Sequence, residues 1–259
     1  MSFKPVGLKI LNAHMYYNDD KIFEDLALEL FPGKWTCLLG TSGVGKTTLL
    51  KLVAGIFDAD KTISSDESTV CTAEIKTSDN LPLAGRIAYM GQEDLLLPWL
   101  SILDNVLLGE KLRRTLSDKK IEHAKYLLKE VGLEKVIFSK PKSLSGGMKQ
   151  RAALARTLME NKPLVLMDEP FSALDAITRY RLRKMSAELL KGRTVLLVTH
   201  DPIEAVCLGN YVQIMTGSPA KLKNIGGLSD TKIPREPDSK EVLSKYAEIM
   251  KYMEEAVHI

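Results

Sequence analysis

The chain has 259 residues, of which 27% are charged and 45% are hydrophobic, a balance that is ordinary for a globular protein with a full core. The net charge of +3 is spread over interspersed lysines and glutamates, so it favours no nucleic-acid partner. No run approaches the roughly 18 apolar residues of a membrane span, so we expect any membrane role to be peripheral. The three cysteines lack metal-ligand spacing and are expected to be reduced packing residues.

Two strands are expected first in chain order. Residues 8–17 and 22–30 alternate loosely in hydrophobicity and are separated by Asn18-Asp19-Asp20, which predicts a turn between them. Tyr17, at the end of the first strand, offers a ring that can stack on a nucleotide base. Plain packing on a half-buried strand is the more common role for tyrosine, so this alternative stays open.

The glycine-rich stretch from residue 40 to residue 48 organises the rest of the chain. It follows the apolar run 35–39, precedes a helical pattern over 48–57, and fits the pattern G-x-x-x-x-G-K-[ST]. Its glycines allow successive N–H groups to point at one anion, and the helix start adds partial positive charge. We expect nucleotide contacts from Gly40, Thr41, Ser42, Gly43, Val44, Gly45, Lys46, Thr47 and Thr48.

Within this stretch, Lys46 supplies a point charge for the outer phosphates and the Thr47 hydroxyl is placed to ligate Mg²⁺. A glycine-rich turn with a chance lysine is the alternative. The motif alone indicates a P-loop nucleotide binder and leaves kinases, GTPases and ATPases open.

The middle of the chain is a polar region followed by an apolar one. Residues 58–80 are rich in Ser, Thr, Asp and Lys, and 69–76 within them alternate enough for one exposed strand of a small antiparallel sheet. Residues 86–90 predict a short strand that ends at Gly91-Gln92. The apolar run 95–100 is then either core or, if exposed, a docking surface for another protein.

Helices are expected next. Residues 117–131 have helical periodicity and stop at Gly132, and residues 144–151 open a second helix. Ser145, Gly146 and Gly147 lie where that helix offers free N–H groups, which makes a second anion site. An ordinary serine cap is the alternative.

Two carboxylates follow the continuous apolar run 164–167, which is typical of a buried parallel strand. Asp168 and Glu169 therefore lie at a strand's carboxyl end, where ligands bind in open α/β sheets. Asp168 suits a Mg²⁺ ion that keeps most of its waters, and Glu169 can hold a water for attack on a terminal phosphate. Solvated carboxylates at a strand end are the alternative.

The next expected elements are a helix over 176–190 and a strand over 194–199. His200 follows directly after that strand. Asp201 and Pro202 give a strong helix start, which fixes His200 at the lip of the sheet. A neutral imidazole there can donate one hydrogen bond to a phosphate oxygen. Beyond Gly217 the chain is polar and less regular, until residues 242–257 predict an amphipathic helix that packs on its own domain.

Together these motifs resemble, in order and approximate spacing, the ATP-binding subunits of ABC transporters over about residues 8–216. The discriminating element is Leu144-Ser145-Gly146-Gly147, which kinases and GTPases lack. The resemblance implies an α/β fold: a P-loop NTPase core with a mostly parallel sheet, an antiparallel β subdomain and an inserted α-helical subdomain. We expect an ATPase domain over 1–220, the helical insertion at about 93–160, and a C-terminal extension over 221–259.

The same resemblance implies an ATP hydrolase with ATP and Mg²⁺ as cofactors. It assigns catalysis to Lys46, Glu169 and His200, and the metal to Thr47, Gln92 and Asp168. Tyr17 resembles the aromatic residue that stacks on adenine. Further nucleotide contacts are implied for Gln92, Ser145, Gly146, Gly147 and Asp175.

The resemblance also implies partners. With one P-loop and one signature element, the chain has half of each site and is expected to act as a homodimer that ATP closes. A membrane permease is expected to dock near Gln92 and residues 95–100, with an extracytoplasmic solute-binding protein involved indirectly. The ATPase is then expected at the cytoplasmic face of the membrane.

The run 96–100, followed by Asp104-Asn105-Val106, is similar to subunits that serve taurine, alkanesulfonate, nitrate and pyrimidine-precursor importers. Residues 58–80 and Lys149 depart from the usual pattern. An exporter ATPase, a soluble ABC-type ATPase outside transport, and a nucleotide-binding regulator without turnover are the alternatives.

Overall fold

The computed structural model describes residues 4–17, 20–56, 69–228 and 232–257. The chain divides into two compact units. The first contains residues 1–87, 163–168 and 191–259, and the second contains residues 88–162 and 169–190. Of the predicted turn Asn18-Asp19-Asp20, the first two residues lie outside the described residues, and so does the part of the polar region over 58–68.

A mostly parallel sheet forms the centre of the first unit. Within that unit the strand order is β6 (Leu164–Asp168), β7 (Thr194–Val198), β3 (Trp35–Gly40), β8 (Tyr211–Thr216) and β9 (Lys221–Gly227). The first four strands run parallel, and β9 runs antiparallel to β8. Strands β3, β6 and β7 are buried at every position, which explains their uninterrupted apolar runs.

The expectation of irregular structure after Gly217 was wrong, because residues 221–227 form strand β9. It is last in the sheet order and mostly exposed, so its residues are polar and lack the alternation that marks a half-buried strand. Its pairing with β8 could not be inferred from that composition.

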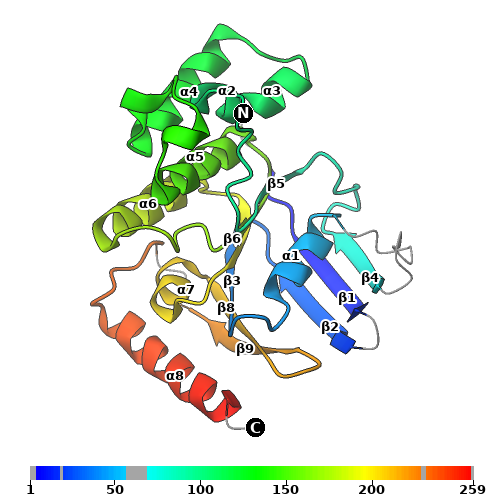
Figure 1. The fold of residues 1–259 in the computed structure, drawn as a ribbon. Coiled ribbons are helices and arrows are strands. Elements are labelled where there is room, and N and C mark those ends of the chain that lie inside the picture. Colours follow the sequence, from blue (N-terminus) through cyan, green and yellow to red (C-terminus); the bar gives the residue numbers. More distant parts are fainter. Residues whose placement is uncertain (1–3, 18–19, 57–68, 229–231, 258–259) are drawn as a thin grey trace. The chain divides into compact units, whose positions relative to one another are not determined.

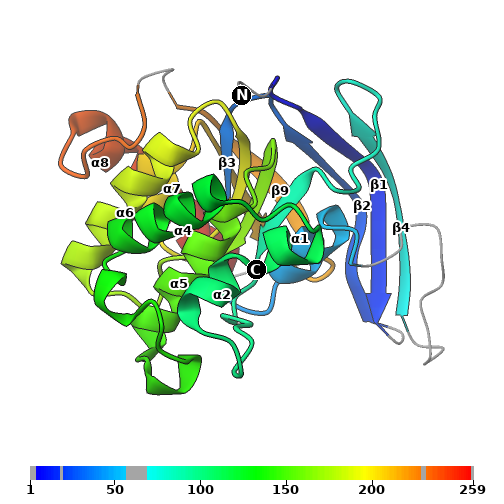
Figure 2. The ribbon, with the colours of Figure 1, turned by 90° about the horizontal axis from the view of Figure 1, so that it is seen from above.

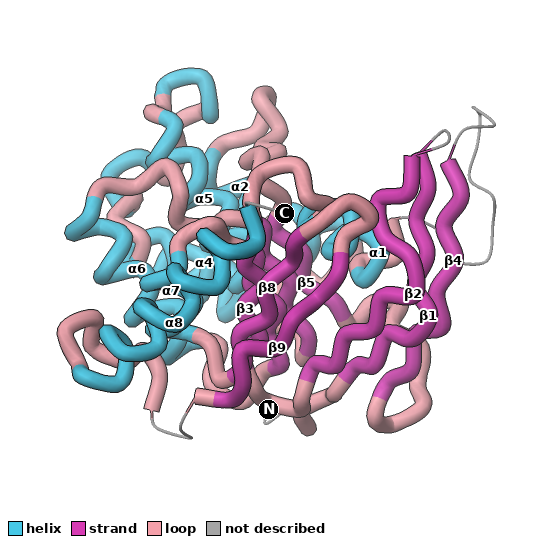
Figure 3. The backbone as a smooth tube through the Cα atoms, turned by 90° about the horizontal axis from the view of Figure 1, so that it is seen from below, coloured by secondary structure: helices cyan, strands magenta, loops and turns pink. Residues whose placement is uncertain are grey.

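A separate antiparallel sheet also belongs to the first unit. Strands β1 (Leu8–Tyr17), β2 (Asp20–Leu30) and β4 (Thr69–Thr77) lie side by side in the order β2-β1-β4, as Figure 3 shows. The predicted pair of N-terminal strands and the exposed strand after the polar region are therefore confirmed.

Three helices complete the part of this unit that the structure describes. α1 (Lys46–Val53) packs its leucines against β3, β6 and β7, and it begins two residues earlier than predicted because Gly45 is its N-cap. α7 (Pro202–Leu208) packs on β3. The predicted amphipathic helix is α8 (Lys240–Val257), which lies along α7 with Val242 and Ile249 fully buried (Figure 1).

The second unit is helical apart from most of β5 (Ile87–Met90), which leads into it. α2 (Ile102–Val106) and α4 (Asp118–Glu130) pack against α5 (Gly146–Met159), as Figure 2 shows. The remaining elements are α3 (Leu108–Leu112), the 3-10 turns Glu134–Val136 and Pro141–Ser143, and α6 (Ala176–Leu189). Among the described residues, no helix combines the length and apolar character needed to cross a bilayer.

Candidate functional site

Three neighbouring strands of the first unit end level with one another. Leu38 of β3 and Asp168 of β6 are both register partners of Val198 on the intervening strand β7. Gly40 comes two residues after Leu38, and His200 comes two residues after Val198. The P-loop, Asp168 and His200 therefore share the carboxyl edge of the sheet, which is where open α/β sheets bind ligands.

The glycines of the P-loop are required for two different reasons. A Cβ at position 40 would lie 2.5 Å from the carbonyl oxygen of Met215, so Gly40 is needed for close approach of β3 and β8. Gly43 and Gly45 have φ of +83° and +105°, a backbone region that side chains disfavour. Gly45 also faces Ile22, whose Cγ2 would lie 2.9 Å from an added Cβ.

Lys46 is buried and its charge is directed into the loop. Its Nζ donates to the carbonyl oxygens of Gly40, at 2.8 Å, and Thr41, at 2.7 Å. Helix α1 starts from Gly45, which makes no side-chain cap hydrogen bond, and the first amides of a helix point toward its N-terminal end. Amides and ammonium together form a fitting cradle for a triphosphate.

Thr47 and Asp168 are brought together from positions 121 residues apart. The Thr47 hydroxyl donates to Oδ2 of Asp168 at 2.7 Å, and Asp168 is almost fully buried. A hydroxyl and a carboxylate are the hard oxygen ligands that Mg²⁺ takes, and this ion usually keeps several waters. The two side chains therefore fit a magnesium ion that is shared with a phosphate substrate.

His200 is exposed at the tip of β7. The backbone beside it is fixed, because the Thr199 hydroxyl bonds to the Glu204 carboxylate and accepts from the Asp201 amide at 3.1 Å. Asp201 caps α7 through the amides of Ile203 and Glu204, as predicted. At the end of β1, Tyr17 is 56% exposed, and its stacking role stays a prediction.

Ser145 and Asp175 begin two helices of the second unit. Ser145 is the N-cap of α5, and its hydroxyl accepts from the amide of Met148 at 3.3 Å. Gly146 and Gly147 are the first residues of that helix, as predicted. Asp175 caps α6 by accepting from the amide of Thr178 at 2.9 Å, and this hydrogen bonding lowers the pKa of the Asp175 carboxyl.

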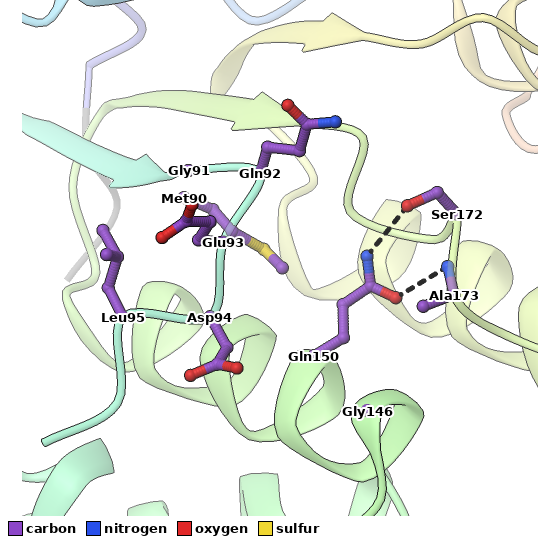
Figure 4. Close-up of a pocket in the computed structure, with 10 residues that line it drawn as sticks. All are labelled: Met90, Gly91, Gln92, Glu93, Asp94, Leu95, Gly146, Gln150, Ser172 and Ala173. Atoms are coloured by element: carbon purple, nitrogen blue, oxygen red, sulfur yellow. Dashed lines mark hydrogen bonds between the residues drawn. The ribbon is translucent and has the colours of Figure 1, made fainter. Parts of the chain in front are cut away.

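A cavity of about 460 Å³ opens in the second unit beside α5. Gln92 lies exposed at this cavity, as Figure 4 shows, with Gln150 and Gly146 contributed by α5. The full lining is Met90, Gly91, Gln92, Glu93, Asp94, Leu95, Gly146, Gln150, Ser172 and Ala173. Gln150 was given no role from the sequence, although it lies in the quoted segment 144–151. The burial of its polar side chain is seen only in the structure, so no sequence pattern marks it.

Glu169 has a left-handed backbone, with φ of +48°. Its carbonyl oxygen accepts hydrogen bonds from Gln150 Nε2 at 2.9 Å and from Ser172 Oγ at 3.0 Å. The predicted site residues thus fall into two sets. Tyr17, the P-loop, Asp168 and His200 belong to the first unit, whereas Gln92, the residues 145–147, Glu169 and Asp175 belong to the second.

A P-loop, a buried hydroxyl–carboxylate pair and a histidine at one edge of a parallel sheet define a P-loop nucleoside triphosphatase.

Comparison with known proteins narrows this class. The family described as ABC transporter matches residues 23–172. The chain is 44% identical over 208 residues to an ABC transporter ATP-binding protein of Haemophilus influenzae, covering 80% of this chain and 81% of that one. It is 41% identical over 213 residues to the aliphatic sulfonates import ATP-binding protein SsuB 1 of Rhodococcus jostii, covering 82% and 80%.

Among solved structures, the fold is similar to a dimeric ATP-binding cassette in a post-hydrolysis state bound to ADP and Pi. The TM-score is 0.71, with 26% identity over 85% of this chain and 99% of that one. The chain belongs to the ABC transporter family and is an ATP-binding cassette that binds and hydrolyses ATP. The predicted family, fold class, enzyme activity and use of ATP with Mg²⁺ are confirmed, whereas the domain boundaries and the roles of individual residues stay predictions.

Proposed function

We propose that this chain is the ATPase subunit of an ABC importer and that it drives uptake of a small polar solute through a separate membrane permease. The observation that carries the proposal is the identity of 41% to an aliphatic sulfonates import ATP-binding protein over four-fifths of both chains. The run 96–100 resembles the same group of importers. A small organic anion of the sulfonate class is accordingly the proposed solute.

The proposed chemistry assigns one task to each group of the site. Lys46 and the loop amides neutralise the outer phosphates, and Thr47 and Asp168 would hold Mg²⁺, which supplies further positive charge. Glu169 orients the attacking water and accepts its proton, and His200 donates to the terminal phosphate. Tyr17 stacks on the adenine.

The second nucleotide contact is proposed to come from a twin chain. Ser145, Gly146 and Gly147 open helix α5, where amides point out of the helix. The solved neighbour is a dimer with ADP and Pi bound, which supports a homodimer here. We therefore assign to Ser145, Gly146, Gly147 and Asp175 contacts with the nucleotide held by the partner copy, and to Gln92 contacts with the metal.

The permease contact is proposed at the exposed residues that follow Gln92. Leu95 is 58% exposed and Trp99 is 66% exposed, although Leu96 between them is buried. Arg156 holds this segment by donating to the carbonyl oxygens of Asp94, at 2.6 Å, and Leu95, at 2.7 Å. Apolar side chains presented on a fixed backbone suit a protein partner. A chain docked in this way would work at the cytoplasmic face of the membrane.

The ATPase assignment is tested by replacing Glu169. Glu169→Gln should keep ATP binding, accumulate as a dimer in size-exclusion chromatography with ATP, and lose turnover. Glu188→Gln makes the same change at an exposed position on α6 and should behave as the parent protein. Turnover of Glu169→Gln at the parent rate would overturn the general-base assignment.

The transport assignment needs the whole complex. The chain is to be purified with its permease and reconstituted in vesicles together with the proposed extracytoplasmic solute-binding protein. ATP-driven accumulation of radiolabelled taurine, an alkanesulfonate and nitrate is then to be measured. Uptake of a sulfonate supports the proposed solute class. Outward movement of the solute would support an exporter instead.

A further inference from the structure

Gln150 is a buried glutamine of α5 that reaches away from its own helix. It is 7% exposed, and its carboxamide makes three hydrogen bonds. Nε2 donates to the carbonyl oxygen of Glu169 at 2.9 Å and to Ser172 Oγ at 3.3 Å, and Oε1 accepts from the amide of Ala173 at 3.0 Å. Figure 4 shows the carboxamide directed at the segment that carries Ser172 and Ala173.

The backbone that Gln150 holds is an unusual one. Glu169 has φ of +48°, a conformation that residues other than glycine rarely adopt and that persists where the surroundings fix it. Its carbonyl oxygen also accepts from Ser172 Oγ at 3.0 Å and from the Ser172 amide at 3.3 Å. Three donors on one oxygen fix the peptide plane, and with it the direction in which the Glu169 side chain leaves the backbone.

The three donors to the Glu169 carbonyl oxygen come from two different parts of the chain. Two come from Ser172, which lies only three residues from Glu169 and belongs to the same turn. Gln150 alone among the three comes from another element, since it lies 19 residues earlier on α5. It therefore ties the Glu169 backbone to the helix that Ser145 opens.

We propose that Gln150 is a positioning residue for ATP hydrolysis, which orients the Glu169 carboxylate by holding the Glu169 carbonyl against helix α5. This inference rests on the proposed role of Glu169 as the general base. Gln150 itself needs no contact with the nucleotide. Its loss should lower the rate of the chemical step and leave nucleotide binding unchanged.

Two variants of nearly equal size separate orientation from packing. Gln150→Glu keeps the length of the side chain and an acceptor for the Ala173 amide, but it places a carboxylate oxygen against the carbonyl oxygen of Glu169. Gln150→Met removes donor and acceptor together. Gln213→Glu makes the same chemical change on β8 in the first unit and serves as the control for added charge.

The expected result is a loss in kcat of roughly 10- to 100-fold for both Gln150 variants, with KM for ATP within about threefold of the parent. The pH profile then distinguishes them. Burial and the facing carbonyl raise the pKa of the introduced carboxyl, so acidification protonates it and restores a donor. Activity relative to the parent should therefore recover between pH 8 and pH 6 for Gln150→Glu and stay flat for Gln150→Met.

Thermal unfolding and equilibrium ATP binding, measured on the same samples, identify any variant that fails to fold. Parent-like kcat in both Gln150 variants, with Glu169→Gln inactive, would overturn the positioning role and leave the proposed function intact. Equal losses in kcat and in ATP affinity, without pH recovery, would also overturn it by showing a merely structural role. Full turnover by Glu169→Gln would instead overturn the general-base assignment itself.

Discussion

The Thr47 hydroxyl donates a hydrogen bond of 2.7 Å to the Asp168 carboxylate, and so joins the start of α1 to the end of β6. This contact places two of the three proposed magnesium ligands, Thr47 and Asp168, at one point of the sheet edge. Thr47→Val keeps the shape of the side chain and removes the hydroxyl, whereas Thr47→Ser keeps the hydroxyl. We predict that Thr47→Val raises the Mg²⁺ concentration for half-maximal ATPase activity by about 10- to 100-fold.

The measurement is a magnesium titration of ATP hydrolysis at saturating ATP. Thr47→Ser should follow the parent curve within about threefold, because the oxygen ligand is retained. Coincident titrations of the valine and serine variants would remove Thr47 from the metal site.

Gly40 is predicted to be more sensitive to alanine than Gly43, although both lie in the P-loop. At position 40 a Cβ would meet the Met215 carbonyl oxygen at 2.5 Å, and both atoms belong to paired strands that cannot easily move apart. Gly40→Ala should therefore lower the free energy of unfolding by about 1–3 kcal/mol. At position 43 a Cβ would meet no atom within 4 Å, so only the cost of φ at +83° remains, about 1 kcal/mol.

Urea unfolding without nucleotide measures both costs. The comparison isolates steric clash from backbone conformation, since the two glycines share one loop. A Gly43→Ala variant less stable than Gly40→Ala would contradict the clash at Met215.

Asp79 and Arg86 make the stability of the first unit depend on pH. The Arg86 guanidinium donates to both carboxylate oxygens of Asp79, and this bonding holds the pKa of Asp79 well below its ordinary value. A carboxyl with a lowered folded-state pKa stabilises the fold at pH above its unfolded value of about 3.9. The contribution is lost as pH falls below that value toward the folded-state pKa.

Arg86→Met removes the donor and should raise the pKa of Asp79. The variant is therefore predicted to be less stable than the parent at pH 7, and the difference between them should narrow as pH falls below about 4. Urea unfolding at pH 7, 5, 4 and 3 measures this difference. A gap that widens on acidification would show that Arg86 acts through contacts other than Asp79.

How far the sequence predicts this molecule depends on the range of each interaction. The helix starts at Ser145 and Asp201 were predicted because a cap is decided by the next three residues. Buried parallel strands were predicted from their apolar runs. By contrast, β9 depends on pairing with β8, and the role of Gln150 depends on a turn 19 to 23 residues away. No local pattern reports such partners.

Arg235 donates hydrogen bonds to backbone carbonyls at the C-terminal end of α7. The final carbonyls of a helix have no partner within the helix. Arg235 supplies donors for the carbonyls at this helix end. Its guanidinium donates to the carbonyl oxygens of Val206, at 3.0 Å, and Gly209, at 2.7 Å, and its backbone amide donates to the carbonyl oxygen of Cys207 at 2.9 Å. Arg235 is 6% exposed, so water cannot readily replace these bonds.

Arg235→Met keeps the backbone bond to Cys207 and leaves the two other carbonyls buried without their charged donor. We predict a loss of about 2–4 kcal/mol in the free energy of unfolding, since each lost bond has a charged donor and strands a buried acceptor. Lys245→Met is the matched control, because the Lys245 ammonium also donates to a carbonyl, that of Ile225 at 2.8 Å, but lies nearer the surface. Equal losses in urea unfolding of the two variants would mean that burial of Arg235 adds nothing. A larger loss for Arg235 would mean that the segment before α8 stabilises the helix that follows His200.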